Sequence, residues 1–309
     1  MDAYTQLLEG ALIVRETSSS IQEFKLYHYN PTIGGAVAFV LLFLGTTSFH
    51  TYQSFRTQCW FVIPLIIGGI FEFIGYAARC VSGKESPNWT LGPYITQSLL
   101  LLVAPSLLAA TIYMELGRVI SLVNGESHCL IRKQWLTKIF VFGDVLSFFL
   151  QGGGGGYQAS GTASALETGA HIIIVGLFVQ LVFFGFFIAI AVKFHLSISR
   201  VPTIRSSNEL PWQKHMNTLY IASTLIMVRS IFRVVEYLQG FDGHLLHHEA
   251  YLYIFDGLLM FLVMVSSNVV HPSELAASMK HKTATEYEVN LRVFAERHQR
   301  LGSDTSSHA

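Results

Sequence analysis

The chain has 309 residues, of which 51% are hydrophobic and only 13% are charged, and its formal net charge at pH 7 is zero. A soluble domain usually carries about 25% charged residues, so this composition favours a membrane protein, and the balanced charge gives no bulk preference for nucleic acid. The three cysteines, Cys59, Cys80 and Cys129, are too few and too scattered for a disulfide scaffold or a zinc motif.

Seven stretches of the sequence are long and apolar enough to cross a membrane, which takes about 20 mostly apolar residues for about 30 Å of hydrocarbon. In chain order they are Thr32–His50, Trp60–Arg79, Tyr94–Glu115, Lys138–Gly156, Gly169–Val192, Thr218–Gln239 and Tyr251–His271. They predict an all-α, polytopic membrane protein with a bundle of seven transmembrane helices. Pro31 precedes the first stretch and Pro272 follows the last, as suits a residue that cannot continue a helix. We therefore expect an N-terminal tail over 1–31, a seven-helix domain over 32–271 and a polar tail over 272–309.

The basic residues are divided unequally between the two sides of the predicted bundle. Most of them fall on the side of the loops after spans one, three and five and of the C-terminal tail, whereas the other side holds Arg15, Lys25, Arg79 and Lys84. The positive-inside rule then places the C-terminus in the cytoplasm and the N-terminus outside. Asn88-Trp89-Thr90 is an acceptor sequon in the second outer segment, so we expect N-glycosylation at Asn88.

Polar and charged side chains recur inside the predicted spans. A charge near the bilayer centre costs about 2.5–3.5 kcal/mol on the insertion scale, so such residues should face the bundle interior and find partners. Helical spacing agrees, because residues three, four or seven apart share one face. The stripes are Glu72, Tyr76 and Arg79; Asp144, Ser147 and Gln151; and Arg229, Arg233 and Glu236; Gln97, Gln180 and Asp256 are isolated members of the set.

The depth of these residues predicts a polar cavity that opens outward or into the outer leaflet. Arg229 lies roughly 17 Å along its span at 1.5 Å per residue, near the midplane, and most of the set lies further toward the outside. The alternative interpretation is a set of ion pairs that only fix helix register: Arg233 with Asp256 or Glu236, and Glu72 with Arg79. We favour a binding site or pathway, because charges that serve only packing are costly and apolar replacements are often no worse.

Two further features allow more than one interpretation. The five glycines Gly152–Gly156 could unwind the outer end of span four, allow a close helix approach, or simply begin the outer loop. The loop from Asp242 to Glu249 contains three histidines that could bind a metal, but its spacing matches no zinc pattern. We expect a solvated loop, no metal and no other cofactor.

An ordered set of residues from Tyr29 to Pro272 resembles the fungal lipid-translocating exporter family, also called the RTA-like or aminocholesterol-resistance family. No single motif is specific, but the ordered set across seven spans is. Thr32 departs from the serine that more often follows the proline. The residues that carry the resemblance are Tyr29-x-Pro31, His50, Glu72-x-x-Gly75-Tyr76-x-x-Arg79, Gln97, Ala104-Pro105, Ala109-Ala110, Tyr113, Arg118, Asp144-x-x-Ser147-x-x-x-Gln151-x-x-Gly154, Gly176-Leu177-x-x-Gln180, Arg229-x-x-Phe232-Arg233-x-x-Glu236, Glu249, Tyr253, Asp256 and His271-Pro272.

The resemblance implies a membrane protein linked to sphingoid long-chain-base release, lipid asymmetry and resistance to amphiphilic toxins. We therefore expect a transporter or exporter of lipids or amphiphiles, with membrane lipids and amphiphilic small molecules as its partners. The plasma membrane is the expected location, with the vacuole or another endomembrane as the alternative. The sequence has no Walker A motif, so transport would not be powered by a nucleotide site in this chain.

Two other functions compete with transport. A seven-helix receptor or sensor shares the predicted topology, but Glu115-Leu116-Gly117-Arg118 at the end of span three does not resemble an Asp-Arg-Tyr signature. An intramembrane lipid hydrolase, similar to alkaline ceramidases, would need a convergent histidine site. His50, His171 and His271 lie at opposite ends of their spans, so we assign no catalytic residue.

Overall fold

The computed structural model describes residues 31–158, 162–203, 205–206, 212–240, 243, 245, 248–280 and 282–283. Within these ranges, seven helical spans are long and apolar enough to cross a membrane, which confirms the predicted seven-helix fold. The first six are α2 (Ile33–Thr57), η1 with α3 (Trp60–Val62 and Ile63–Lys84), α4 (Leu91–Leu122), α5 (Lys133–Gln158), α6 (Ala163–Arg200) and α7 (Trp212–Leu238). The seventh is formed by α8 (Glu249–Leu252), η4 (Tyr253–Leu258) and α9 (Leu259–Val269). The predicted N-terminal tail lies outside the described residues except for Pro31, whereas the predicted C-terminal tail is described over 272–280 and 282–283, and 273–280 are helical.

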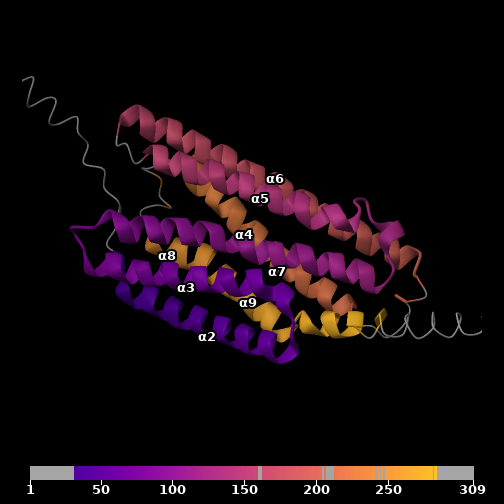
Figure 1. Ribbon diagram of the computed structural model, residues 1–309. Coiled ribbons are helices and arrows are strands. Elements are labelled where there is room, and N and C mark those ends of the chain that lie inside the picture. Colours follow the sequence, from indigo (N-terminus) through magenta and orange to yellow (C-terminus); the bar gives the residue numbers. More distant parts are fainter. Residues whose placement is uncertain are drawn as a thin grey trace, which may run out of the picture.

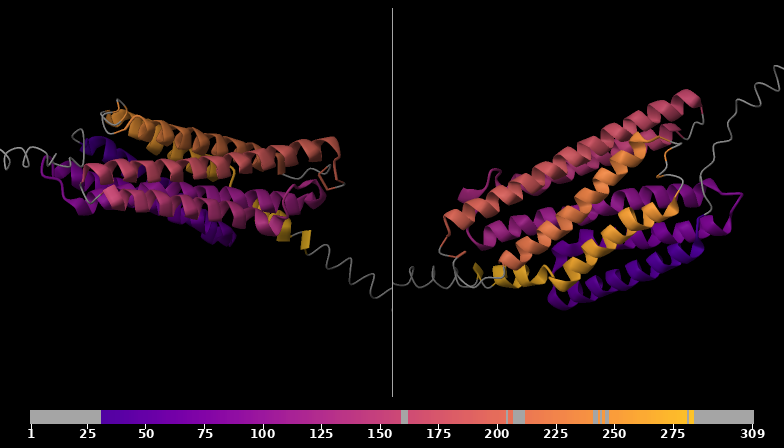
Figure 2. Two further views of the ribbon diagram at one scale, coloured as in Figure 1. Left: turned by 90° about the horizontal axis from the view of Figure 1, so that it is seen from above. Right: turned by 180° about the vertical axis from the view of Figure 1, so that it is seen from behind.

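Helices α4 and α7 run through the middle of the bundle (Figure 1). α4 contacts α3, α5, α7 and α9, and α7 also contacts α6 and α9. α5 and α6 lie side by side on one flank, and α2, α3 and α9 form the other flank, as the view from behind in Figure 2 shows.

We name the two ends of the bundle by residues that lie there. The Glu249 end is predicted to face outward, and the Arg118 end, where the η2 turn (Glu126–His128) joins α4 to α5, is predicted to face the cytoplasm.

Large apolar side chains cover the outside of the bundle. Leu41 is 63% exposed, Phe149 69% and Val182 65%. A soluble protein rarely exposes a continuous apolar surface, so this surface fits contact with lipid chains. The interior between α4, α5 and α6 is also apolar and is filled by rings: Tyr113 lies 5.4 Å from Phe140 and 4.6 Å from Phe187, measured between ring centroids.

The glycine run is helical throughout, because α5 continues to Gln158. Neither the predicted unwinding nor the predicted loop start is therefore correct, and the close helix approach is the interpretation that stands. A Cβ atom on Gly154 would lie 2.7 Å from the carbonyl oxygen of Gly169 in α6, so only glycine fits there. Small residues at such points let helix backbones pack closely in a membrane.

We expect Gly154→Ala to destabilise the α5–α6 pair, because the new methyl group would collide with backbone that cannot rotate away. Overpacking of this kind costs about 1–3 kcal/mol. Thermal unfolding of the purified protein in detergent measures the effect. Gly155→Ala is the matched control, since a Cβ there meets nothing within 4 Å. Equal stability of the two variants would contradict the close contact.

Glycosylation and protease protection test the predicted orientation of the chain across the membrane. Asn88 is exposed between α3 and α4, at the Glu249 end. We expect it to carry a glycan that is lost in Asn88→Gln, and a tag fused after Ala309 to resist protease added to sealed cells. Cleavage of that tag from outside would reverse the assignment.

Candidate functional site

The last span contains a π-helical turn, and this turn carries Asp256. In η4 the backbone hydrogen bonds join residues five apart instead of four apart, a feature that often marks functional positions. The Asp256 side chain is buried and forms an ion pair with Arg229 of α7, with 2.5 Å between Oδ1 of Asp256 and Nε of Arg229. Gly257 follows it, and a Cβ atom there would collide with the hydroxyl of Tyr76 in α3. The turn thus holds the last span against both α7 and α3.

Arg229 also satisfies a backbone carbonyl that α4 leaves open. Pro105 lies inside α4 and has no N–H to donate to the carbonyl oxygen four residues earlier, on Leu101. Nη2 of Arg229 donates to that oxygen at 2.9 Å. One guanidinium therefore neutralises Asp256 and replaces the hydrogen bond that proline removes, and it links α7, α4 and the last span.

Glu72 and Tyr76, one turn apart on α3, complete this buried cluster. Glu72 is 1% exposed and interacts electrostatically with both Asp256 and Arg229. Among the residues that the structure describes, neither of its carboxylate oxygens has a hydrogen-bond partner, and the hydroxyl of Tyr76 has none either. Two carboxylates therefore face one guanidinium, which leaves a formal charge of −1 when all three are ionised. We call Glu72, Tyr76, Arg229 and Asp256 the central cluster.

A second ionic group closes the Glu249 end. Nη2 of Arg79 lies 2.6 Å from Oε1 of Glu249, and its Nε donates to the hydroxyl of Tyr253 at 3.1 Å. The backbone N–H of Thr32 donates to the same carboxylate at 2.9 Å, which ties the start of α2 to the last span. The alternative pairing of Glu72 with Arg79 is therefore wrong. Glu249 was not predicted as a partner, because the loop from Asp242 to Glu249 was expected to be solvated.

Arg233 is not the direct partner of Asp256. Its Nη1 contacts Oε2 of Glu236 at 2.7 Å, three residues along the same helix, and its guanidinium lies 5.6 Å from the ring centroid of Tyr237. It still lies within electrostatic reach of Asp256. Of the two alternative partners, Arg233 thus pairs with Glu236, but this pair lies within α7 and does not link two helices. Arg229 takes the place beside Asp256 that was expected of Arg233.

The polar residues of α5 and α6 form a separate group. Ser147 donates to the carbonyl oxygen of Gly176 at 2.7 Å, and Nε2 of Gln151 lies 2.5 Å from Oγ of Ser147 and 3.3 Å from Oε1 of Gln180. These bonds join α5 to α6. Two other predicted members are also buried: Asp144 lies beside the hydroxyl of Tyr113, and Gln97 lies in α4, one turn before Leu101.

The central cluster is enclosed. Arg229 is 2% exposed and Asp256 is 3% exposed, so these side chains do not line a cavity open to solvent in this conformation. A cavity lined by described residues lies instead at the Arg118 end. The arrangement can bind a cation in an apolar surrounding, provided that the helices move to admit it.

No group of three or more His, Cys, Asp or Glu side chains suited to a metal occurs among the described residues. Most of the loop from Asp242 to Glu249 lies outside them. The rings of His50 and His271 lie 5.9 Å apart at the Arg118 end, far along the chain from His171 at the start of α6.

Comparison with known proteins points to one family of membrane proteins. Residues 65–279 match the family described as RTA1 like protein. The chain is 37% identical to Protein RTM1 of Saccharomyces cerevisiae over 80% of its own length and 91% of that protein. It is 36% identical to Protoporphyrin uptake protein 1 of S. cerevisiae, over 82% and 93%. It is 26% identical to the Sphingoid long-chain base transporter RSB1 of S. cerevisiae, over 72% and 67%. No solved structure matches the chain.

Mutation of the buried ion pair should show strong coupling. Arg229→Ala leaves Asp256 buried without its guanidinium, which costs about 3–5 kcal/mol in a soluble core and less in a membrane, where the unfolded chain also finds partners. We expect the double variant Arg229→Ala, Asp256→Ala to lose less stability than the two single variants together. Unfolding in mixed micelles, followed by circular dichroism, measures this. Additive losses would contradict the pairing, and the partly exposed pair Arg233 and Glu236 gives the comparison cycle.

Proposed function

Because the chain belongs to the RTA1-like family of integral membrane proteins, we propose that it transports amphiphilic lipids that carry a cationic amine, such as sphingoid long-chain bases. One relative is named for the transport of such bases and another for protoporphyrin uptake, which supports a membrane transporter role for amphiphiles. We further propose that this transport serves lipid asymmetry or resistance to toxic amphiphiles, and that it takes place in the plasma membrane.

The observation that carries the proposal is the buried carboxyl group of Glu72, which has no hydrogen-bond partner among the described residues. Its oxygens accept no hydrogen bond from the described residues, and it lies beside an ion pair that already uses the positive charge of Arg229. A buried carboxylate without a partner is costly, so an ammonium group that reached Glu72 would remove that cost. The apolar chain of the ligand would remain among the apolar side chains of the bundle or in the lipid.

Transport also requires that the central cluster become accessible. In the closed arrangement Arg79 and Glu249 pair at the end that is predicted to face outward, and Arg79 lies on the same face of α3 as Glu72 and Tyr76. We propose that separation of this pair opens the path to Glu72. The roles we assign to these charged side chains are binding and gating, and we assign no catalytic step to them.

The test is flux of a labelled sphingoid base across proteoliposomes that contain the purified full-length chain. We expect Glu72→Gln and Asp256→Asn each to lower the rate about tenfold or more, because each removes a charge-assisted interaction of about 1.5–3 kcal/mol. The N-acetylated base has the same chain without the charge and should be carried poorly by all forms.

Glu126→Gln is the matched control variant. It removes an exposed carboxylate in the η2 turn, at the Arg118 end, and should leave the flux unchanged. Normal flux in both Glu72→Gln and Asp256→Asn, at normal protein abundance, would show that the central cluster only holds the helices together.

A further inference from the structure

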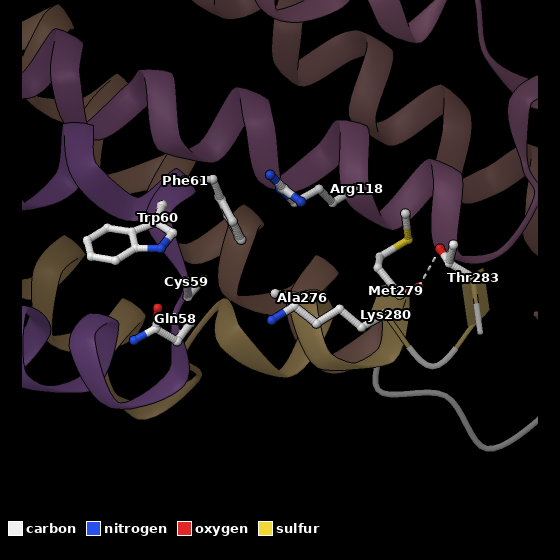
Figure 3. A pocket seen from close by; sticks show the side chains of 9 residues that line it. All are labelled: Gln58, Cys59, Trp60, Phe61, Arg118, Ala276, Met279, Lys280 and Thr283. Carbon is white, nitrogen blue, oxygen red and sulfur yellow. Dashed lines mark hydrogen bonds between the residues drawn. The ribbon is translucent and has the colours of Figure 1, made fainter.

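A cavity of about 730 Å³ lies at the Arg118 end, away from the central cluster (Figure 3). Three parts of the chain form it: the turn between α2 and α3 with residues 58–61, the inner part of α4 with Arg118, and the helical segment 273–280 with Thr283. This volume falls within the range of ordinary ligand sites. In Figure 3 Arg118 and Lys280 extend from opposite walls toward Phe61 and Cys59.

The two cations have no carboxylate partner at ion-pair distance among the residues that the structure describes. The Arg118 guanidinium instead lies 3.8 Å from the ring centroid of Phe61. The nearby carboxylate of Glu115 is already engaged, since its Oε1 lies 2.8 Å from Nδ1 of His215. The cavity therefore presents positive charge that no described side chain neutralises.

Cys59 does not supply the missing negative charge. Arg118 and Lys280 both favour its thiolate, but burial dominates and raises the pKa of the Cys59 thiol to about 11. The thiol is therefore neutral at physiological pH, and the cavity keeps its two positive charges.

Aromatic side chains place the cavity at the level of the lipid headgroups. Trp60 lines it and is 50% exposed, and Trp135 at the start of α5 is 57% exposed at the same end. Tryptophan concentrates at the membrane–water interface because its ring is apolar and its N–H is polar. Ala276 and Met279 add an apolar wall, so the cavity offers a cationic region and an apolar region to one ligand.

We propose that this cavity binds the phosphate headgroup of an anionic phospholipid. Arginine and lysine are the side chains that bind phosphate, and the fork of a guanidinium matches its oxygens. The Arg118 end is predicted to face the cytoplasm, and the cytoplasmic leaflet carries the anionic lipids. The lipid chains would extend along Trp60, and the headgroup would connect segment 273–280 to α4. The site does not depend on the transport proposal, because it shares no residue with the central cluster.

The probe is phosphatidylserine with brominated chains, which quenches tryptophan fluorescence, titrated into nanodiscs that hold the full-length chain in phosphatidylcholine. We expect saturable quenching beyond that of brominated phosphatidylcholine, and its loss in Trp60→Phe. Lys280→Gln should raise the half-saturating lipid fraction about tenfold, as expected for one charge-assisted hydrogen bond, and Arg118→Gln with Lys280→Gln should raise it further. Lys280 is exposed, so its replacement does not threaten folding.

The control variant carries Arg132→Gln and Lys193→Gln, which remove two exposed charges at the same end outside the cavity. It should bind as the unmodified chain does. An equal shift in this control would show attraction by surface charge alone and overturn the site. Unchanged binding in Arg118→Gln with Lys280→Gln would do the same. Displacement of the lipid by inorganic phosphate at comparable concentration would reject a lipid headgroup as the ligand.

Discussion

The buried guanidinium of Arg229 is the constraint on which the centre of the bundle depends. A positive charge cannot stay unpaired in an apolar interior, so α4 and the last span both supply partners to this side chain of α7. Asp256 supplies the counter-charge, and the π-helical turn in the last span carries that carboxylate. Leu101 supplies a carbonyl that Pro105 has released from the hydrogen bonding of α4. The carbonyl of Leu101, which Pro105 leaves without a donor in α4, thus becomes the acceptor for a side chain on a helix three spans later.

The carboxyl group of Glu72 decides the net charge of the central cluster. A cluster with equal numbers of positive and negative charges, such as the pair Arg229 and Asp256 alone, would only link helices. When it is ionised, the carboxyl group of Glu72 adds a negative charge that no described residue stabilises with a hydrogen bond. Under the proposed function, an excess of one ionised buried carboxylate favours a cation over an anion or a neutral molecule, so we expect the ligand's headgroup to matter more than its chain.

Much of the fold follows from the sequence, because span length, apolar content and polar stripes each report a local property. The stripes on α3 and α7 correctly predicted inward faces for Glu72 and Arg229. Which charges meet was not predictable, because pairing depends on helix rotation and on local distortions. The π-helical turn shifts the face on which Asp256 lies, and Pro105 opens a backbone acceptor that no side-chain pattern reveals. The glycine run was ambiguous for a similar reason: only the position of Gly169 on the neighbouring helix distinguishes a tight contact from a broken helix.

The order of residues along α3 links the central cluster to the entrance that we propose at the Glu249 end. Glu72, Tyr76 and Arg79 follow one face of the helix, so Tyr76 separates the charged side chains of the central cluster from the ionic group at the Glu249 end. The Tyr76 ring is stacked with Phe39 of α2, 5.1 Å between centroids, and lies 6.1 Å from Tyr253 of the last span. Glu249 holds Arg79 and Thr32 together directly above these rings. A ligand that moves along this face has to displace an ion pair first and an aromatic stack second, and only then does it meet the carboxylate of Glu72. Movement of Glu249 away from Arg79 would also weaken the hold on the start of α2, because the same carboxylate accepts from the backbone N–H of Thr32, so one event at the Glu249 end would affect α2, α3 and the last span together.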